Sequence, residues 1–221
     1  MIGTPVILIA RLLALLPFLA LLAACGPSPS SDTVAREHPM YPGIQDGEFF
    51  IPPVPPQYLI SSNIRTEVPY LGPDEPGSIV VDTYARRLYH VHEGGTATRY
   101  AIAVGRENLS FRGTGVVGRK QEWPSWQPTR NMIRTQPDMY AEFAAGLPGG
   151  LDNPLGARAL YLFDEGVGDT FLRIHGTPEP WTIGSAVSNG CVRLVNEHVI
   201  DLYGRVAIGT RAVLYPKVPA A

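Results

Sequence analysis

The chain from residue 77 onward consists of short runs rich in β-branched and aromatic residues, separated by glycines and other turn residues. Such runs predict β-strands, and Gly94–Gly95 predicts a hairpin turn between two of them. The predicted strands are Ser78–Thr83, Leu88–Glu93, Ala97–Val104, Leu160–Phe163, Thr170–Ile174, Arg205–Ile208 and Arg211–Tyr215. With 23 glycines, 22 prolines and 17% charged residues, the composition suits a loop-rich β protein. We therefore expect a mainly β fold, a mixed-strand sandwich or open barrel.

Two short helices are expected within this β pattern. Pro137–Ala145 begins with a proline, which is favoured in the first turn of a helix, and Gly146 follows its end. Glu197–Tyr203 is preceded by Asn196, a good N-cap residue, and is followed by Gly204. Both helices are too short to form a layer of their own.

The N-terminal residues are predicted to be an export signal. Leu12–Leu22 is apolar but too short to span a bilayer, so residues 1–24 are predicted to be a signal peptide. The run Leu-Ala-Ala-Cys ending at Cys25 resembles a bacterial lipobox, in which the cysteine is lipidated and becomes the first residue of the mature protein. The alternatives are an ordinary signal peptide cut near Ala24 and an uncleaved anchor starting at Val6.

A proline-rich region follows the leader, since 11 of the 22 prolines lie in residues 25–76. Residues 26–47 are polar and predict a tether, whereas residues 49–60 are apolar and are expected to lie extended against the domain without a ladder of their own. We expect the main folded domain, whose chemistry is considered below, to span residues 77–216 and a tail to span residues 217–221.

Charge excludes one class of partner. Removing the leader takes away Arg11 alone, which leaves 17 basic and 20 acidic residues and a net charge of −3. No basic stripe or Lys/Arg cluster is present in the sequence, so we expect no nucleic-acid partner.

The stretch Arg173–Asn196 holds the residues that point to chemistry. Cys191 follows Gly190, and His175 lies sixteen residues earlier. A thiol attacks well only as thiolate, and a nearby imidazole is the usual base that produces one. If Cys25 is lipidated, Cys191 has no disulfide partner, and a free thiol in an exported domain is more often catalytic than structural. The alternative is a buried, inert cysteine.

Three motifs together resemble the bacterial L,D-transpeptidase catalytic domain of the YkuD type. They are His-Gly-Thr at His175–Thr177, Ser-Asn-Gly-Cys-Val-Arg at Ser188–Arg193 and Asn-Pro-Leu-Gly-Ala-Arg at Asn153–Arg158. The resemblance covers roughly residues 77–216 and implies the family's mixed-strand β fold with two short helices.

The resemblance also implies the roles of individual residues. Cys191 would be the nucleophile, His175 the general acid and base, and the backbone carbonyl of Gly176 would orient the imidazole. The amides of Asn189, Gly190 and Cys191 would form an oxyanion hole. Many members have a histidine before the Gly-Cys pair, whereas this chain has Asn189, which cannot act as a second acid or base.

The implied reaction is acyl transfer on peptidoglycan stem tetrapeptides. The thiol would attack the carbonyl of the third residue, the terminal D-alanine would leave, and an amine of a second stem would take the acyl group to give a 3→3 cross-link. The resemblance implies neither metal nor cofactor. It further implies a part in peptidoglycan biosynthesis, cell-wall organisation and cell shape, and acylation by carbapenem-type inhibitors.

Substrate-binding residues are predicted less sharply. Arg193 could bind a stem carboxylate or form a structural salt bridge, and Ser188 could contact substrate or stabilise the turn. Trp126, together with Tyr161 and Trp181, could form an aromatic wall of the site or belong to the core.

Several functions share this site. Water as acceptor would make an L,D-carboxypeptidase, and a protein lysine as acceptor would make an enzyme that attaches proteins to the wall. A different class is a wall-binding lipoprotein without catalysis, and an unrelated cysteine peptidase has no local signature here. Whichever of these functions applies, lipidation of Cys25 would make this an exported, membrane-anchored protein of the periplasm or cell surface.

Overall fold

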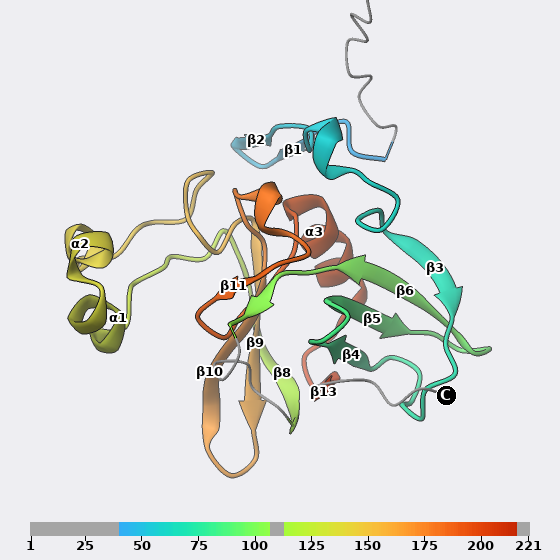
Figure 1. The fold of residues 1–221 in the computed structure, drawn as a ribbon. Coiled ribbons are helices and arrows are strands. Elements are labelled where there is room, and N and C mark those ends of the chain that lie inside the picture. The colour runs from blue at the N-terminus through green and yellow to red at the C-terminus, as the bar shows by residue number, and fades with distance from the viewer. Residues whose placement is uncertain (1–39, 107–112, 216–221) are drawn as a thin grey trace, which may run out of the picture. The chain divides into compact units, whose positions relative to one another are not determined.

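The computed structural model describes residues 40–106 and 113–215 (Figure 1). The predicted leader, the lipidation site at Cys25 and the tail beyond residue 216 lie outside these ranges. In the described part of the chain, no helix has the length and apolar character needed to cross a bilayer.

Thirteen short strands dominate the described residues. They are β1 Ile44–Asp46, β2 Phe49–Ile51, β3 Thr66–Pro69, β4 Ile79–Asp82, β5 Arg87–Val91, β6 Thr96–Ala101, β7 Val104–Gly105, β8 Gly113–Glu122, β9 Arg158–Asp164, β10 Gly168–His175, β11 Ala186–Ser188, β12 Val192–Arg193 and β13 Arg211–Tyr215. Their abundance confirms the prediction of a mainly β fold.

Nine of these strands form one open sheet in the order β12-β10-β9-β8-β13-β4-β5-β6-β3. Most neighbours are antiparallel, but β12 runs parallel to β10 and β13 runs parallel to β4. Strands β1 and β2 form a separate pair, and so do β7 and β11. The sheet is therefore mixed and not closed into a barrel. Figure 1 shows it strongly twisted, with β8, β9 and β10 in one half and β4, β5, β6 and β3 in the other.

The main core lies inside this twisted sheet. Its buried side chains are mostly the aliphatic residues of the predicted strands, including Ile79, Val81, Leu88, Ile102, Val117, Leu160, Leu162, Ile174 and Leu214. Val199 and Leu202 of the C-terminal helix complete it, and both are fully buried. Burying one such aliphatic side chain stabilises the fold by about 1.5–3 kcal/mol. This core holds β9, β10 and β12, which carry the candidate site.

Three short α-helices are present in the described residues, where two were expected. They are α1 Arg130–Thr135, α2 Pro137–Tyr140 and α3 Asn196–Arg205, accompanied by 3-10 turns at Pro56–Tyr58, Ala141–Phe143 and Pro180–Thr182. The predicted helix at residues 137–145 is thus α2 plus a 3-10 turn. Helix α1 was not predicted, and its N-cap is Thr129, whose hydroxyl accepts a hydrogen bond from the amide of Met132.

The region before residue 77 is built into the structure more closely than the sequence indicated. The expectation that residues 49–60 add no ladder was wrong, because Phe49–Ile51 pairs with Ile44–Asp46. Gly47 adopts a φ of +63° in the tight turn between them, which glycine tolerates at little cost. Strand β3 then joins the edge of the large sheet beside β6.

Buried polar contacts attach this N-terminal region to the rest of the fold. Arg158 donates two hydrogen bonds to Asp46, of 2.6 and 2.8 Å, and Phe49 packs on Trp123 with ring centroids 4.3 Å apart. The hydroxyl of the buried Tyr41 lies 2.7 Å from Nε2 of His198 on α3. Figure 1 shows β1 and β2 at the same end of the molecule as α3.

Candidate active site

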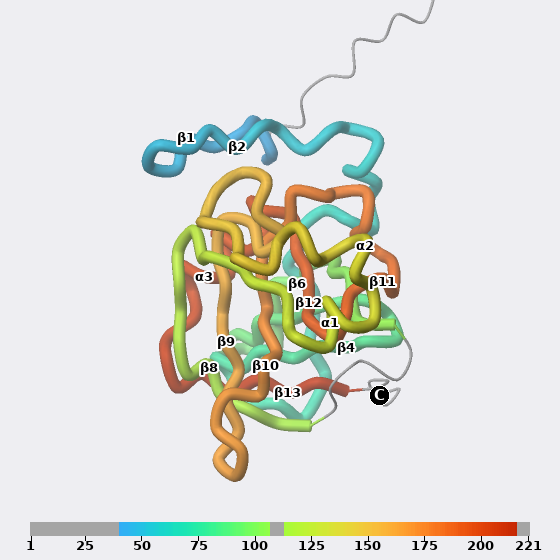
Figure 2. The backbone as a smooth tube through the Cα atoms, turned by 90° about the vertical axis from the view of Figure 1, so that its left-hand side faces the viewer, coloured from blue at the N-terminus to red at the C-terminus, as the bar shows by residue number. Residues whose placement is uncertain are grey.

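Cys191 and His175 line one cleft, whose volume is about 720 Å³. One wall is formed by the β8-β9-β10-β12 end of the large sheet. The opposite wall includes Met132 and Tyr140, which belong to α1 and α2 in the long connection between β8 and β9. Figure 2 shows these helices in front of β12 and next to β11. The cleft is therefore walled by segments far apart in the sequence.

The register of the sheet places the key side chains in two adjacent rows. One row runs Gln121, Ala159, His175, Arg193 across β8, β9, β10 and β12. The next row runs Arg119, Tyr161 and Arg173 across β8, β9 and β10. Cys191 continues this row, because Val192 is opposite Ile174 on parallel strands and the residues before them, Cys191 and Arg173, are therefore neighbours too. Directly opposed residues share a face of the sheet, and residues two apart on a strand do too. Both rows therefore face the same side of the sheet, where all their members except Gln121 and Ala159 line the cleft.

His175 ends strand β10 with its imidazole almost fully buried, at 4% exposure. Its Nδ1 lies 2.6 Å from the carbonyl oxygen of Gly176. Because a carbonyl only accepts, Nδ1 carries the proton and Nε2 is left as the basic atom. Burial, and after it the charge of Arg193, lowers the pKa of His175 to about 3, although the Gly176 carbonyl acts in the opposite direction. The imidazole is thus neutral and of one tautomer near neutral pH.

A tight contact fixes the Gly176 carbonyl. The side-chain oxygen of Asn196 accepts a hydrogen bond of 3.0 Å from the Ala157 amide. A Cβ at Gly176 would lie 2.3 Å from that same oxygen, so no larger residue fits without displacing Asn196. The Gly176 amide donates to the carbonyl of Arg158 at 3.0 Å. The residue that orients His175 is therefore held on both sides.

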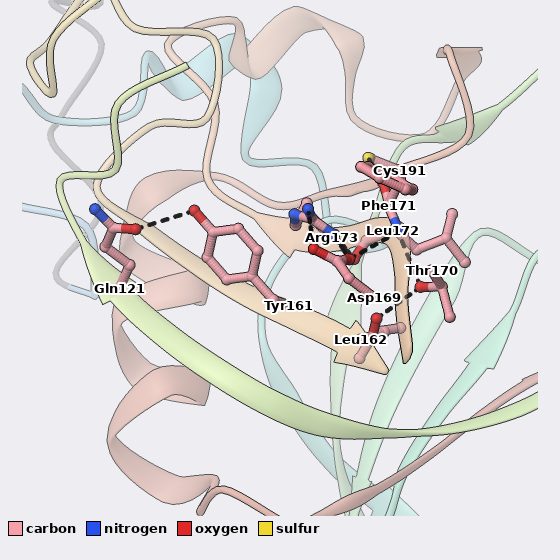
Figure 3. A network of polar contacts seen from close by, with 9 residues as sticks. All are labelled: Gln121, Tyr161, Leu162, Asp169, Thr170, Phe171, Leu172, Arg173 and Cys191. Atoms are coloured by element: carbon pink, nitrogen blue, oxygen red, sulfur yellow. Dashed lines mark hydrogen bonds and ion pairs between the residues drawn. The ribbon is translucent and has the colours of Figure 1, made fainter. Parts of the chain in front are cut away.

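Cys191 is half-buried and is not in a disulfide. Its thiol donates to the carbonyl oxygen of Phe171, with Sγ and the oxygen 3.9 Å apart (Figure 3). Burial raises the pKa of the thiol, and the lowering effects of Arg173 and Arg193 do not offset it. The resting cleft consequently holds a neutral thiol and a neutral imidazole.

The Phe171 carbonyl reaches the sulfur because β10 contains a bulge between Asp169 and Arg173. Phe171 adopts a φ of +60°, a conformation that costs a non-glycine residue free energy. Side chains hold it there, since Asp169 accepts the Phe171 amide at 2.9 Å and Thr170 Oγ1 accepts the Leu172 amide at 3.2 Å. Figure 3 shows this set of contacts directly below the sulfur. The sequence predicted a regular strand at Thr170–Ile174 and did not reveal the bulge.

The turn before Cys191 is organised by Ser188. Its hydroxyl donates to the carbonyl of Cys191 at 2.6 Å and accepts from the amide of Gly190 at 3.2 Å. Gly190 has a φ of +122°, a region that essentially requires glycine. The amides of Asn189 and Cys191 donate no hydrogen bond to any other described residue.

The description of a known catalytic domain fits this arrangement. A family model described as the L,D-transpeptidase catalytic domain, YkuD, matches residues 76–214, which is more than half of the chain. The chain belongs to the L,D-transpeptidase family.

Relatives with this description are known in Escherichia coli K12. The probable L,D-transpeptidase ErfK/SrfK is 32% identical over 161 residues, which cover 72% of this chain and 46% of that protein. The probable L,D-transpeptidase YbiS is 35% identical over 136 residues, which cover 60% of this chain and 42% of that protein. This chain therefore matches less than half the length of both relatives.

One solved structure with higher identity carries a different description. It comes from Brucella melitensis, is described as a probable carnitine operon oxidoreductase, and is 48% identical with a TM-score of 0.49. The match covers 70% of this chain and 95% of that one. The family assignment rests on the family model.

The substrate-binding residues predicted for this L,D-transpeptidase domain are partly engaged with the protein itself. Arg193 Nη1 lies 3.0 Å from a carboxylate oxygen of Glu179. Trp126 lines the cleft and packs against Tyr140 with ring centroids 6.2 Å apart. Tyr161 also lines the cleft, whereas Trp181 is 57% exposed and is not part of its wall.

Two contacts in the L,D-transpeptidase cleft were not predicted. Asn189 donates from its side-chain amide to the hydroxyl of Tyr140 at 3.2 Å, which links the turn before Cys191 to α2. Arg119 stacks on Tyr161, with its guanidinium carbon 3.6 Å from the ring centroid. Among residues 40–106 and 113–215, no three His, Cys, Asp or Glu side chains are grouped to hold a metal ion.

Proposed function

We propose that this chain forms 3→3 cross-links in peptidoglycan through a cysteinyl acyl-enzyme on stem tetrapeptides. Cys191 is the nucleophile, His175 the general acid and base, and Gly176 the residue whose carbonyl orients the imidazole. The observation that carries the proposal is the 2.6 Å hydrogen bond from His175 Nδ1 to the Gly176 carbonyl. It leaves Nε2 as a proton acceptor in the cleft that Cys191 lines.

In the first half-reaction the Cys191 proton passes to His175 Nε2 while sulfur attacks the carbonyl carbon of the third stem residue. The tetrahedral intermediate then collapses, the bond to the terminal D-alanine breaks, and the departing nitrogen takes the proton from His175. A thioester and free D-alanine result, and the imidazole is neutral again.

In the second half-reaction an amine of another stem attacks the thioester and gives its proton to His175. Collapse forms the new amide bond and expels sulfur, which recovers the proton. Water as acceptor gives an L,D-carboxypeptidase, and a protein lysine gives attachment of a protein to the wall. All three share the acyl-enzyme and differ only in the nucleophile that enters the cleft.

Backbone amides of Asn189, Gly190 and Cys191 stabilise the oxyanion in this proposal. The amides of Asn189 and Cys191 make no hydrogen bond within the described residues, whereas that of Gly190 donates to Ser188 Oγ. Gly190 would therefore contribute only if Ser188 releases it. One such donor is worth about 2.7–4 kcal/mol in other acyl-transfer enzymes.

Arg193, Ser188 and Trp126 are proposed to contact the substrate. A stem carboxylate would have to replace Glu179 at Arg193, because the two side chains are already paired at 3.0 Å. Trp126 offers a half-buried aromatic surface on the cleft wall. Ser188 acts chiefly by supporting the turn through its two hydrogen bonds.

We further propose that the protein is exported and anchored to a membrane through lipidated Cys25, in the periplasm or at the cell surface. The Leu-Ala-Ala-Cys run supports this. Cys25→Ser is expected to keep activity and to leave the membrane fraction, and unchanged fractionation would refute the anchor.

Mass spectrometry of products decides the function. Wild-type protein incubated with tetrapeptide fragments is expected to yield dimers that have lost one alanine, and His175→Ala and Cys191→Ala are expected to yield none. Loss of alanine without dimers would favour the carboxypeptidase. Exposure to a carbapenem tests the non-catalytic alternative, because a nucleophilic Cys191 should form a covalent carbapenem adduct. If wild type formed no adduct, or if Cys191→Ala formed as much adduct as wild type, Cys191 would not be the nucleophile.

A further inference from the structure

Three side chains form a row across the sheet beside the nucleophile. Arg119 on β8 and Arg173 on β10 are both opposite Tyr161 on β9. Their guanidinium carbons lie 3.6 and 4.3 Å from the centroid of the Tyr161 ring. The Tyr161 hydroxyl is itself held, since it donates to Gln121 at 3.2 Å. All three residues of the row line the cleft.

The two arginines of this row differ in their partners. Arg173 donates to both carboxylate oxygens of Asp169, at 2.7 and 3.0 Å, so its charge is compensated (Figure 3). Arg119 is exposed and forms no ion pair with a carboxylate of the described residues. Stacking on an aromatic ring occupies the face of a guanidinium and leaves its in-plane N–H donors free. Arg119 thus has no direct carboxylate partner among the described residues, although its charge also helps to lower the pKa of Asp169, which is paired with Arg173.

The wall of the cleft has an excess of positive charge. Arg106, Arg119, Arg173 and Arg193 line it, against the carboxylates Asp152 and Glu179. A cleft lined by one sign of charge attracts ligands of the opposite sign. The free charge at Arg119 therefore matches an anionic group on the substrate.

We propose that Arg119, seated on Tyr161, binds a free carboxylate of the donor stem peptide and makes the enzyme select stems with free carboxylates over amidated ones. This deepens the proposed function and rests on it. A guanidinium with free in-plane donors binds a carboxylate through two parallel hydrogen bonds, which an amide cannot reproduce.

The position of Arg119 limits which carboxylate it binds. Arg119 belongs to β8, but its guanidinium lies over the Tyr161 ring of β9, and β9 is two strand spacings, roughly 10 Å, from β12. The terminal carboxylate of the leaving D-alanine is only one residue, or about 3.5 Å of extended chain, beyond the reacting carbonyl. Arg119 therefore binds a carboxylate carried by the second or third stem residue, on the side away from the leaving group.

Binding to the inactive Cys191→Ala protein tests the proposal without turnover. The probes are the tetrapeptide with free carboxylates and three analogues, amidated at the second residue, at the side chain of the third, or at the C-terminus. Amidation at the second or the third residue is expected to weaken binding about tenfold, a typical loss for a charge-assisted hydrogen bond. C-terminal amidation is expected to matter less.

Matched variants locate the effect. Arg119→Gln in the Cys191→Ala protein is expected to bind free and amidated peptides equally. Arg130→Gln makes the same change of charge on α1 at an exposed residue outside the cleft wall, and it should retain the tenfold preference. Unchanged melting temperatures show that both variants fold.

Equal affinity of the Cys191→Ala protein for all four peptides, absence of binding to any of them, or a preference that survives Arg119→Gln would each overturn the proposal. The proposed function fails separately. If wild type forms no acyl-enzyme while the Cys191→Ala protein still prefers free carboxylates through Arg119, the carboxylate site stands and the transpeptidase assignment falls. If wild type cross-links free and amidated stems equally well, only the carboxylate site falls.

Discussion

His175 lies directly opposite Arg193 on the parallel strands β10 and β12. The guanidinium charge acts in the same direction as burial, and together they hold the pKa of His175 at about 3. The pKa of Cys191 is raised, chiefly by burial. Both shifts favour the neutral forms of the two side chains, so in the proposed mechanism the proton would move from sulfur to imidazole during attack and not beforehand.

The first prediction concerns pH. An ordinary histidine base loses its function below pH 6.5, whereas His175 stays deprotonated down to about pH 3. The kcat/KM for tetrapeptide should therefore show no acid limb near pH 6.5. Alkylation of Cys191 by iodoacetamide should rise steadily toward pH 9, because the thiol pKa is raised from 9.0. A plateau of alkylation between pH 5 and 7 would indicate a preformed thiolate and contradict this prediction.

The second prediction concerns Ser188. Ser188→Ala removes the hydrogen bonds to the Cys191 carbonyl and from the Gly190 amide, so the turn that presents the sulfur loses its support. Each lost bond at a buried site is worth about 1–3 kcal/mol. We expect kcat to fall at least tenfold with a smaller change in KM, as measured with tetrapeptide.

Ser125→Ala is the matched control for Ser188→Ala. Ser125 also lines the cleft but is exposed. Its substitution is expected to leave kcat within about twofold. Equal losses in both variants would mean that the turn does not depend on the Ser188 hydroxyl.

Local patterns predicted the parts of the fold that depend on neighbours in the sequence. Strands β4, β5 and β6 follow one another through tight turns, and each lies within or near its predicted range. The bulge at Phe171 was missed because the alternation of residues 170–174 fits a regular strand, whereas side-chain hydrogen bonds from Asp169 and Thr170 hold Phe171 at a positive φ. The row of Arg119, Tyr161 and Arg173 depends on the register of three strands, which the sequence does not specify locally.

Asn196 marks the start of the last helix as predicted, but its side chain has a different role from the predicted one. It was expected to cap the last helix, but Asn196 is the first residue of α3, and the residue before it, Val195, provides no side-chain cap. The Asn196 side chain instead accepts the Ala157 amide beside Gly176. Asn196 therefore indicated the helix start correctly, but its side chain forms a tertiary hydrogen bond near His175 in place of a helix cap.

The third prediction concerns the pair of Asp46 and Arg158. Arg158 is 7% exposed in its side chain, and its hydrogen bonds lower the pKa of Asp46. Asp46→Asn leaves a buried charge without its main partner, and we expect a loss of about 2–3 kcal/mol in the free energy of unfolding. The loss should be present at pH 7 and shrink as pH falls through the lowered pKa, because wild-type Asp46 then becomes protonated too.

Urea unfolding of Asp46→Asn and Glu48→Gln separates this pair from a general effect of charge. Glu48 lies in the same hairpin and is exposed. Its variant should unfold within about 0.5 kcal/mol of wild type. If Asp46→Asn matched it, the N-terminal hairpin would be only loosely attached.

The fourth prediction concerns Glu197 on α3, which is 7% exposed and has one carboxylate oxygen without a partner in the described residues. Burial raises its pKa from 4.5 to about 7, against hydrogen bonds from its own amide and that of Val54. The folded state therefore binds a proton more tightly than the unfolded state. This contribution to stability is complete below pH 4.5 and is lost as pH rises to about 7.

Glu197→Gln keeps the shape of the protonated side chain and removes the titration. The variant should match wild type at pH 4.5 and exceed it at pH 8 by at most about 3 kcal/mol, the free energy equivalent to the shift. Glu93→Gln, at an exposed turn residue, should show no such pH-dependent difference. Urea unfolding at the two pH values measures both variants. A gap between Glu197→Gln and wild type that is the same at pH 4.5 and pH 8 would contradict this prediction, because it would show that the pKa of Glu197 is the same in the folded and unfolded states.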